Sequence, residues 1–210
     1  MASPSAHEFF PLLRRRKSYS KRRDGRNYRY GYYRSEIAED CQLRCGYCDC
    51  HEVEIGGATS MDLDHFRPKG QKRFEHLADE PSNLLYACKS CNGLKADWWP
   101  AKGKTATFNG REGFLDPFAV NRHDYFSVTK DGSIQAKRPP ADYVIALLAL
   151  DRPFLLRVRE QRVLKQELAA LVAPLNEMAE ACIAEKRGVD VKKMSRLVLE
   201  MTKRLKRLLS

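Results

Sequence analysis

The chain has 210 residues, 38 of them lysine or arginine and 27 acidic, and the net charge of +11 favours a polyanionic partner such as nucleic acid. That length suffices for one domain with an appendage. No apolar run is long enough to span a membrane and the N-terminus has no hydrophobic signal segment, so a soluble, cytoplasmic protein with no membrane association is expected.

Residues 1–40 form a basic, tyrosine-rich N-terminal arm. Between residues 13 and 34 arginines and lysines are interleaved with tyrosines, a composition typical of segments that contact phosphates and stack on bases. We expect the arm to bind nucleic acid through Arg22, Arg23, Arg26 and Arg29. The alternative is a solvated tail whose charge serves only solubility.

Residues 41–100 are predicted to be a small compact core. Its expected elements are a helix at 33–43, strands at 52–55, 60–65 and 83–88, and a helix at 92–97. Gly56 and Gly57 supply a turn between the first two strands, and Pro100 ends the last helix. The order of strand, long loop, strand and helix predicts an α+β unit.

Two C-x-x-C pairs lie in this core, and each has the spacing that lets two thiolates reach one tetrahedral Zn²⁺. Their cysteines are Cys45, Cys48, Cys88 and Cys91. An odd total of seven cysteines without a signal peptide favours metal-bound thiolates over disulfides. Cys41, Cys50 and His51 lie close enough in sequence to replace one of the four ligands.

A second group of residues has the chemistry of phosphodiester hydrolysis. Asp64 can offer a carboxylate to Mg²⁺ or Mn²⁺, and His65 can act as a general base near neutral pH. Asn92 can add an amide oxygen to the same ion, and Lys95, one helical turn later, is predicted to meet a phosphate. Asp62 alternates onto the strand face of Asp64, so the sequence leaves open whether it shares the metal.

The loop that follows His65 is basic. It is predicted to lie along a phosphate backbone through Arg67, Lys69, Lys72 and Arg73.

These motifs, spread over roughly the segment 45–97, resemble the HNH endonuclease family, which has a ββα-metal fold. The resemblance implies that His65 is the general base and that Asp64 and Asn92 bind the catalytic metal. It implies that Asn83 ties the loop and orients the base, and that the cysteines belong to the zinc-knuckled branch. The sequences of residues 64–69 and 91–95 are similar to those of stand-alone bacterial and phage HNH proteins, some of which act in antiphage defence.

The rest of the chain lies outside this resemblance. Residues 101–140 are predicted to be an irregular connector with a hairpin at 126–137 over Asp131 and Gly132. Residues 141–210 are predicted to be helical, with a kink at Pro174 and a last helix capped by Asp190. The apolar stripe of these helices is expected to form core, or a contact with a protein partner or a second copy.

The predicted fold is therefore α+β, a small zinc-bound ββα-metal nuclease core with a C-terminal helical hairpin. The predicted function is that of a metal-dependent HNH endonuclease acting on DNA, with Mg²⁺ or Mn²⁺ as the catalytic ion and Zn²⁺ as the structural one. Two alternatives remain open: a non-catalytic zinc module that binds nucleic acid, and a nuclease subunit that a partner protein activates.

Overall fold

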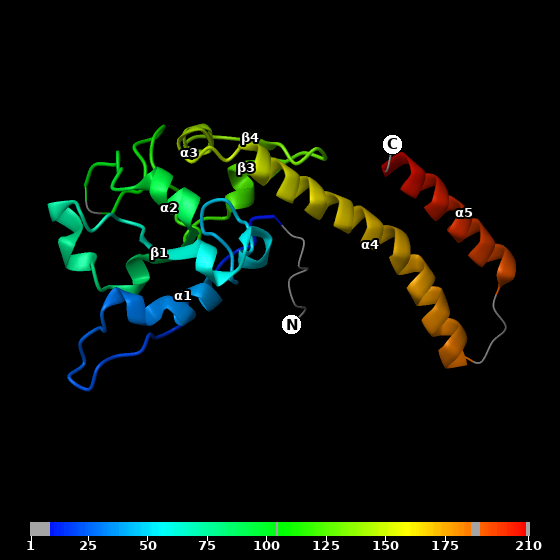
Figure 1. The fold of residues 1–210 in the computed structure, drawn as a ribbon, viewed down its shortest axis with the longest axis horizontal. Helices are drawn as coiled ribbons and strands as arrows, with labels where there is room; N and C mark the ends of the chain where they lie inside the picture. The colour runs from blue at the N-terminus through cyan, green and yellow to red at the C-terminus, as the bar shows by residue number, and fades with distance from the viewer. Residues whose placement is uncertain (1–8, 104, 186–189, 209–210) are drawn as a thin grey trace.

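The computed structural model describes residues 9–103, 105–185 and 190–208. Its α-helices are α1 (Arg34–Asp40), α2 (Lys89–Lys95), α3 (Ala141–Leu147), α4 (Pro153–Glu185) and α5 (Val191–Leu208). Its strands are β1 (Met61–His65), β2 (Leu84–Cys88), β3 (Phe126–Val128) and β4 (Ile134–Ala136). The α+β class and the C-terminal helices are confirmed, and most elements pack into one body from which α4 extends outward (Figure 1).

The centre of the body is a strand–strand–helix unit. β1 and β2 pair antiparallel, with Asp64 opposite Leu85 and His65 opposite Leu84. All five residues of β2 are buried, which explains its run of apolar side chains. α2 follows β2 directly, because the Cys88 sulfur accepts a hydrogen bond from the backbone N–H of Cys91 and caps the helix.

Two predicted elements of the core differ in the structure. The predicted strand at 52–55 is a 3₁₀ helix (Glu52–Ile55), because the side chains of His51 and Glu54 form a reciprocal capping box that favours helical turns. The helix predicted at 92–97 begins earlier, at Lys89, and ends at Lys95, where Ala96 adopts a positive φ of 46°. The second C-x-x-C pair therefore lies at the start of the helix.

The arm is packed against the core over much of its length. Phe10, Leu13 and Tyr33 are fully buried among the core side chains. Arg16 pairs with Asp40 of α1 at 2.9 Å. A short β-bridge between Lys21 and Asn27 closes a turn that carries exposed basic residues.

The predicted hairpin at 126–137 is confirmed as β3 and β4, with Ser127 opposite Gln135. Gly132 lies in its turn at a φ of +78°, and a Cβ there would come within 2.2 Å of the Leu156 carbonyl oxygen. The hairpin therefore fits against the start of α4 only because this residue is glycine.

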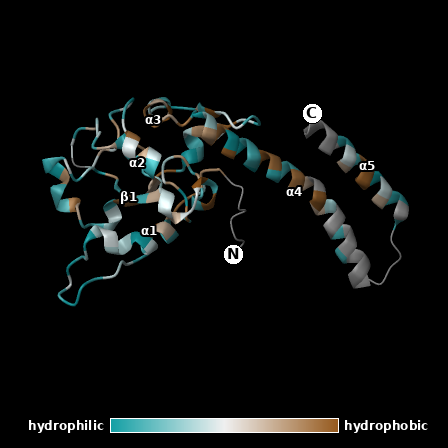
Figure 2. Ribbon diagram, in the orientation of Figure 1, coloured by the Kyte–Doolittle hydropathy of each residue, from teal (hydrophilic) through white to brown (hydrophobic). Residues whose placement is uncertain are grey.

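The helices α4 and α5 form the C-terminal hairpin. The first part of α4 belongs to the body, since Leu155, Val158 and Arg162 are buried there. Beyond it, hydrophilic and hydrophobic residues alternate along α4 (Figure 2), and α5 lies beside it. Pro174 lies inside α4 without ending it, and Asp190 accepts a hydrogen bond from the N–H of Lys193 at 3.0 Å, as its predicted capping role requires. No helix in these described ranges is both long and apolar enough to cross a membrane.

Candidate metal centre and active-site cleft

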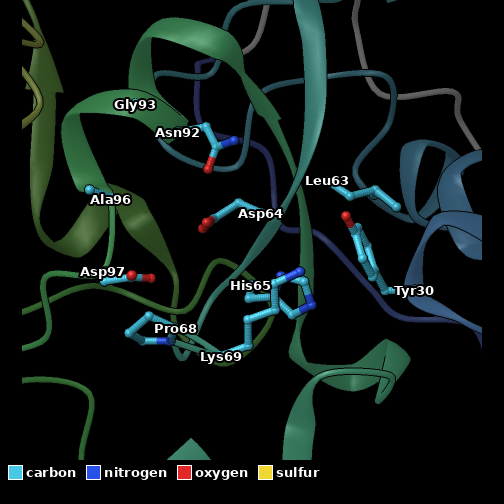
Figure 3. Close-up of a pocket in the computed structure, with 10 residues that line it drawn as sticks. All are labelled: Tyr30, Leu63, Asp64, His65, Pro68, Lys69, Asn92, Gly93, Ala96 and Asp97. Atoms are coloured by element: carbon cyan, nitrogen blue, oxygen red, sulfur yellow. The ribbon is translucent and has the colours of Figure 1, made fainter. Parts of the chain in front are cut away.

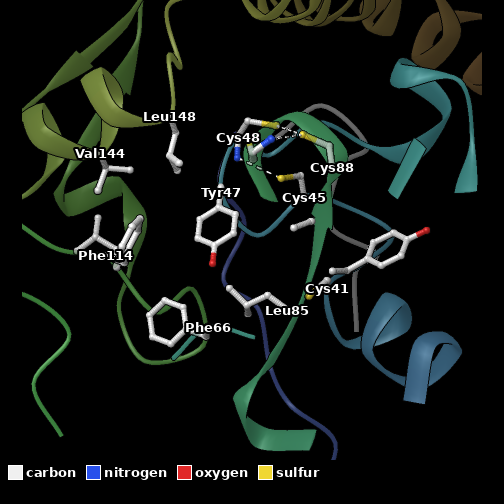
Figure 4. Close-up of a cluster of buried hydrophobic side chains, with 14 of the residues drawn as sticks. Cys41, Cys45, Tyr47, Cys48, Phe66, Leu85, Cys88, Phe114, Val144 and Leu148 are labelled. Carbon is white, nitrogen blue, oxygen red and sulfur yellow. Dashed lines mark hydrogen bonds between the residues drawn. The ribbon is translucent and has the colours of Figure 1, made fainter. Parts of the chain in front are cut away.

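The four predicted zinc ligands meet in space. The sulfur atoms of Cys45, Cys48, Cys88 and Cys91 all lie within 4.8 Å of one another, and all four residues are buried. Figure 4 shows labelled members of this group at the edge of the hydrophobic cluster that contains Tyr47 and Leu85. Four converging thiols from two knuckles fit the tetrahedral ligand set of a structural Zn²⁺.

The three alternative ligands are not in this group of sulfur atoms. His51 uses its Nδ1 to accept the N–H of Val53 at 3.3 Å. Cys41 is fully buried, and this burial raises its pKa to about 12, so its side chain stays a neutral thiol. Cys50 is buried as well but does not belong to the cluster. The set formed by the two C-x-x-C pairs is therefore the one that the geometry favours.

A charged side chain that the sequence did not suggest contacts this cluster. The Nη2 of Arg152 lies 3.7 Å from the Cys91 sulfur and 3.9 Å from the Cys88 sulfur, while its Nη1 donates to the Leu148 carbonyl at 2.8 Å. A guanidinium at this position offsets part of the negative charge of metal-bound thiolates. Arg152 lies between α3 and α4, so it also joins the knuckles to the C-terminal helices.

A cleft of about 350 Å³ opens beside β1 and α2. Figure 3 shows the residues that line it: Tyr30, Leu63, Asp64, His65, Pro68, Lys69, Asn92, Gly93, Ala96 and Asp97. Three of the predicted catalytic or metal-binding residues, Asp64, His65 and Asn92, therefore share one cavity.

Asp64 is held by two donors. The buried ammonium of Lys95 lies 3.0 Å from Oδ2 and 3.1 Å from Oδ1, and the hydroxyl of Tyr47 donates to Oδ2. Lys95 has 0% of its surface exposed and also donates to the His65 carbonyl at 2.9 Å. The sequence placed Lys95 at a phosphate, but the structure places it behind Asp64, where it fixes and neutralises the carboxylate.

The His65 ring is fixed by a backbone carbonyl. Its Nε2 lies 2.7 Å from the Ala78 oxygen, and since a carbonyl only accepts, Nε2 carries the proton and Nδ1 keeps a free lone pair. Burial lowers the pKa of His65 below its ordinary value, although the bond to Ala78 acts in the opposite direction. The ring is therefore neutral at pH 7 and can accept a proton at Nδ1.

Asn92 presents its amide to the cleft from α2. Its Nδ2 donates to Asp62 at 3.4 Å, and Figure 3 shows its oxygen directed toward Asp64. Asp62 is not one of the described residues that line the cleft. The structure thus gives Asp62 a contact that orients Asn92, and the oxygen of Asn92 is directed toward Asp64 in the cleft.

Asn83 lies behind the cleft and binds the backbone of the loop after His65. Its Oδ1 accepts the N–H of Arg67 at 2.9 Å, and its Nδ2 donates to the Arg67 carbonyl at 2.9 Å. A longer bond of 3.5 Å reaches the Leu77 carbonyl. Asn83 therefore ties together the two ends of the loop that surrounds His65.

The predicted nucleic-acid-binding residues fall into two groups. Arg67 donates to the Thr105 carbonyl at 2.8 Å, and Arg73 donates to the carbonyls of Trp99 and Ala101, so both brace the loop. Arg73 is nevertheless exposed. The other predicted residues are exposed and do not brace the loop in this way, with Lys69 at the cleft and the rest farther along the loop or on the arm: Lys72, Arg22, Arg23, Arg26 and Arg29.

Three further residues at the site escaped the sequence reasoning. Tyr47 lies inside the first C-x-x-C pair, and its contact with Asp64 links the knuckle to the cleft. Tyr30 and Asp97 line the cleft from the arm and from the residues after α2. Tyr47 could have been found from its position inside the first C-x-x-C pair, and Asp97 from its position just after Lys95. Nothing in the sequence of the arm distinguishes Tyr30 from its neighbouring tyrosines.

Comparison with known proteins adds one finding to this geometry. A search of curated proteins found no match. The model of the family described as HNH endonuclease matches residues 45–97, which span both cysteine pairs, β1, β2, α2 and most of the cleft. Residues 45–97 are therefore an HNH endonuclease domain, and its cysteine cluster fits the zinc-knuckled branch of that family.

Proposed function

We propose that the protein is a metal-dependent endonuclease that hydrolyses phosphodiester bonds in DNA. The observation that carries the proposal is that Asp64, His65 and Asn92 line one cleft within the segment that matches the HNH family. A base, hard oxygen donors and nearby cations are the groups that phosphodiester hydrolysis needs.

His65 is the general base in this proposal. Its neutral ring accepts a proton at Nδ1 from a water molecule, which attacks the phosphorus opposite the departing 3′ oxygen. The Ala78 carbonyl holds the Nε2 proton and stabilises the imidazolium as it forms. The products carry a 5′ phosphate and a 3′ hydroxyl, as the family resemblance implies.

Asp64 and Asn92 would hold Mg²⁺ or Mn²⁺. The fit rests on donor chemistry, because a carboxylate and an amide oxygen line one open cleft that leaves room for water and phosphate oxygens. When bound, such an ion offsets negative charge on the phosphate and on the departing oxygen. Lys95 and Tyr47 keep the Asp64 carboxylate in place for this role.

Zn²⁺ in the cysteine cluster would be structural. The cluster joins the first knuckle to β2 and α2, so it ties together elements that a unit of this size cannot hold by apolar packing alone. Its thiolates are buried and do not line the cleft among the described residues.

Exposed cations favour DNA as the partner. Lys69 stands at the cleft, and Lys72 with the exposed arginines of the arm extends the positive surface away from it. We place the phosphate backbone along these residues, since cations at successive phosphates supply most of the affinity for nucleic acid. The helices α4 and α5 remain candidates for binding a protein partner or a second copy.

The cellular setting that we propose is antiphage defence in the bacterial cytoplasm. This part rests only on the similarity of residues 64–69 and 91–95 to stand-alone HNH proteins.

Cleavage of supercoiled plasmid with Mg²⁺ or Mn²⁺, beside an EDTA control, tests the proposal. We expect nicked or linear DNA only with the metal, and a rate roughly 100-fold lower for Asn92→Ala. Ser90→Ala, an exposed change on the same helix, should cut like the wild type. Tight, salt-sensitive DNA binding without cleavage would instead support the non-catalytic module or a subunit that awaits its partner.

A further inference from the structure

Tyr30 belongs to the arm, outside the segment that matches the family, yet it forms one wall of the cleft. Its ring packs edge-on against His65, with ring centroids 4.8 Å apart and an interplanar angle of 65°. The Tyr30 residue is 37% exposed, so the ring stands at the mouth of the cleft rather than in the core. In Figure 3, Tyr30 and Asp97 lie on opposite sides of the His65 ring.

Tyr30 is itself held in place at the cleft. The ammonium of Lys69 lies 4.2 Å from the centre of its ring, a cation–π distance. Its backbone N–H donates to Asp79 at 2.9 Å. Nearby in the arm, Tyr28 and Tyr32 stack at 3.9 Å and stiffen the turn that carries Tyr30.

The arm also forms hydrogen bonds with the loop whose Ala78 carbonyl contacts the His65 ring. Asp79 and Glu80 accept hydrogen bonds from Tyr30 and from Asn27, the latter at 3.1 Å. These two acidic residues directly follow Ala78, whose carbonyl holds the Nε2 proton of His65 at 2.7 Å. The arm therefore contacts His65 through a ring and braces the backbone that fixes its tautomer.

We propose that Tyr30 is a positioning residue for His65, so that the arm completes the active site in addition to contacting DNA. The inference rests on the proposed role of His65 as the base. With the Tyr30 ring in place, the imidazole has one allowed plane, and water is kept from the Ala78 hydrogen bond. Without the ring, the imidazole can rotate and share its Nε2 proton with water, so the lone pair at Nδ1 is less often available.

The closest competing role for Tyr30 is stacking on a base of the substrate. A stacking residue contributes to binding, so its loss raises KM and leaves kcat and the state of the free His65 ring unchanged. A positioning residue acts on the ring before substrate arrives. The two roles therefore differ in a measurement that needs no DNA.

The experiment compares wild type, Tyr30→Ala, Tyr30→Leu and Tyr30→Phe as zinc-loaded full-length proteins. ¹⁵N NMR of the imidazole nitrogens, assigned with His65→Ala, reports the tautomer and the exchange of the Nε2 proton. We expect a protected Nε2–H form in wild type and Tyr30→Phe. In Tyr30→Ala and Tyr30→Leu we expect averaged tautomers, kcat lower by about 10- to 100-fold and KM within about twofold.

Leu12→Ala is the matched control, because Leu12 is an exposed apolar residue of the arm that does not line the cleft. It should leave both spectrum and kinetics unchanged. An unchanged Nε2–H tautomer in Tyr30→Ala and Tyr30→Leu would overturn the inference, whether kcat is preserved or only KM rises. Tautomer averaging in these variants would support it even if the wild type fails to cut DNA, and that failure would count against the proposed function alone.

Discussion

The Asp64 carboxylate is almost fully buried and depends on the ammonium of Lys95 and the hydroxyl of Tyr47 for compensation. Taking one partner from a buried pair leaves a charge that neither water nor protein stabilises. This arrangement makes Lys95 a structural support of the cleft, although the sequence shows it only as a cation three residues after Asn92.

We predict that Lys95→Met lowers the free energy of unfolding by about 3–5 kcal/mol, because it leaves the buried Asp64 charge without its cationic partner and with only the Tyr47 hydroxyl as a donor. Urea denaturation of the zinc-loaded protein measures this loss. Lys89→Met, an exposed lysine of the same helix, should change it by less than about 0.5 kcal/mol. A Lys95→Met protein that is as stable as wild type but inactive would place the ammonium on the substrate instead.

A pH dependence follows from the state of His65. Burial lowers the pKa of His65 below its ordinary value of 6.5, and in the proposed mechanism the ring acts as a base only when it is neutral. Cleavage should therefore hold steady as the pH falls to about 6.5 and decline only below it, as the ring takes up a proton. The pH profile of kcat/KM between about pH 5 and 8 measures this limb. A decline in cleavage centred above pH 7 would show that protonation of a group other than His65 causes the loss of activity.

Among the elements, the cysteine cluster joins segments that lie about 40 residues apart in the chain. The first knuckle, the end of β2 and the start of α2 meet at the four sulfur atoms. Tyr47, which lies in the first knuckle, links this cluster to the cleft through its hydrogen bond to Asp64. Loss of the metal should therefore disturb the cleft as well as the knuckles.

We predict that Cys88→Ser loses zinc and unfolds the strand–strand–helix unit, because Cys88 is both a ligand of the cluster and the cap of α2. Metal analysis and circular dichroism of the purified variant measure the two effects. Cys41→Ala, a buried cysteine outside the cluster, should keep its zinc. A folded Cys88→Ser protein with full zinc content would contradict the four-cysteine site.

The sequence correctly predicted the elements that short motifs within one segment specify. The spacing of the cysteines, the Asp64–His65 pair and the apolar run of β2 correctly predicted which segments meet. It did not find the 3₁₀ helix at Glu52–Ile55, whose capping box outweighs its strand-like composition. Nor could it find the contacts of Lys95 with Asp64 or of Tyr30 with His65, since these depend on side-chain directions between segments far apart in the chain.

At the scale of the whole molecule, a buried charge network joins the arm, the first knuckle and α4. Asp49 is 1% exposed and pairs with Arg162 of α4 at 2.8 Å, with Arg44 at 3.6 Å and with Arg122 at 3.8 Å. It also accepts the backbone N–H of Phe10 at 3.0 Å. The start of α4 is thus part of the body that contains the segment matching the HNH family.

We predict that Asp49→Asn destabilises the protein by about 3–5 kcal/mol, because three buried arginines lose their shared carboxylate. Asparagine tolerates the positive φ of 66° at this position, so the change tests charge rather than backbone strain. Urea denaturation measures the loss. Glu39→Gln, which removes an exposed ion pair with Arg16, should cost less than about 1 kcal/mol. If the Asp49→Asn and wild-type proteins are equally stable, this charge network does not hold the arm, the first knuckle and α4 together.

The most direct test of the proposed chemistry is the rate of Mg²⁺-dependent plasmid nicking by wild type, His65→Ala and His76→Ala. His76 is an exposed histidine of the loop that surrounds the cleft, which makes it the matched control. We predict equal nicking by wild type and His76→Ala, and a loss of about 100- to 10,000-fold in His65→Ala with zinc content and fold intact. Nicking by His65→Ala at the wild-type rate would remove His65 from the mechanism.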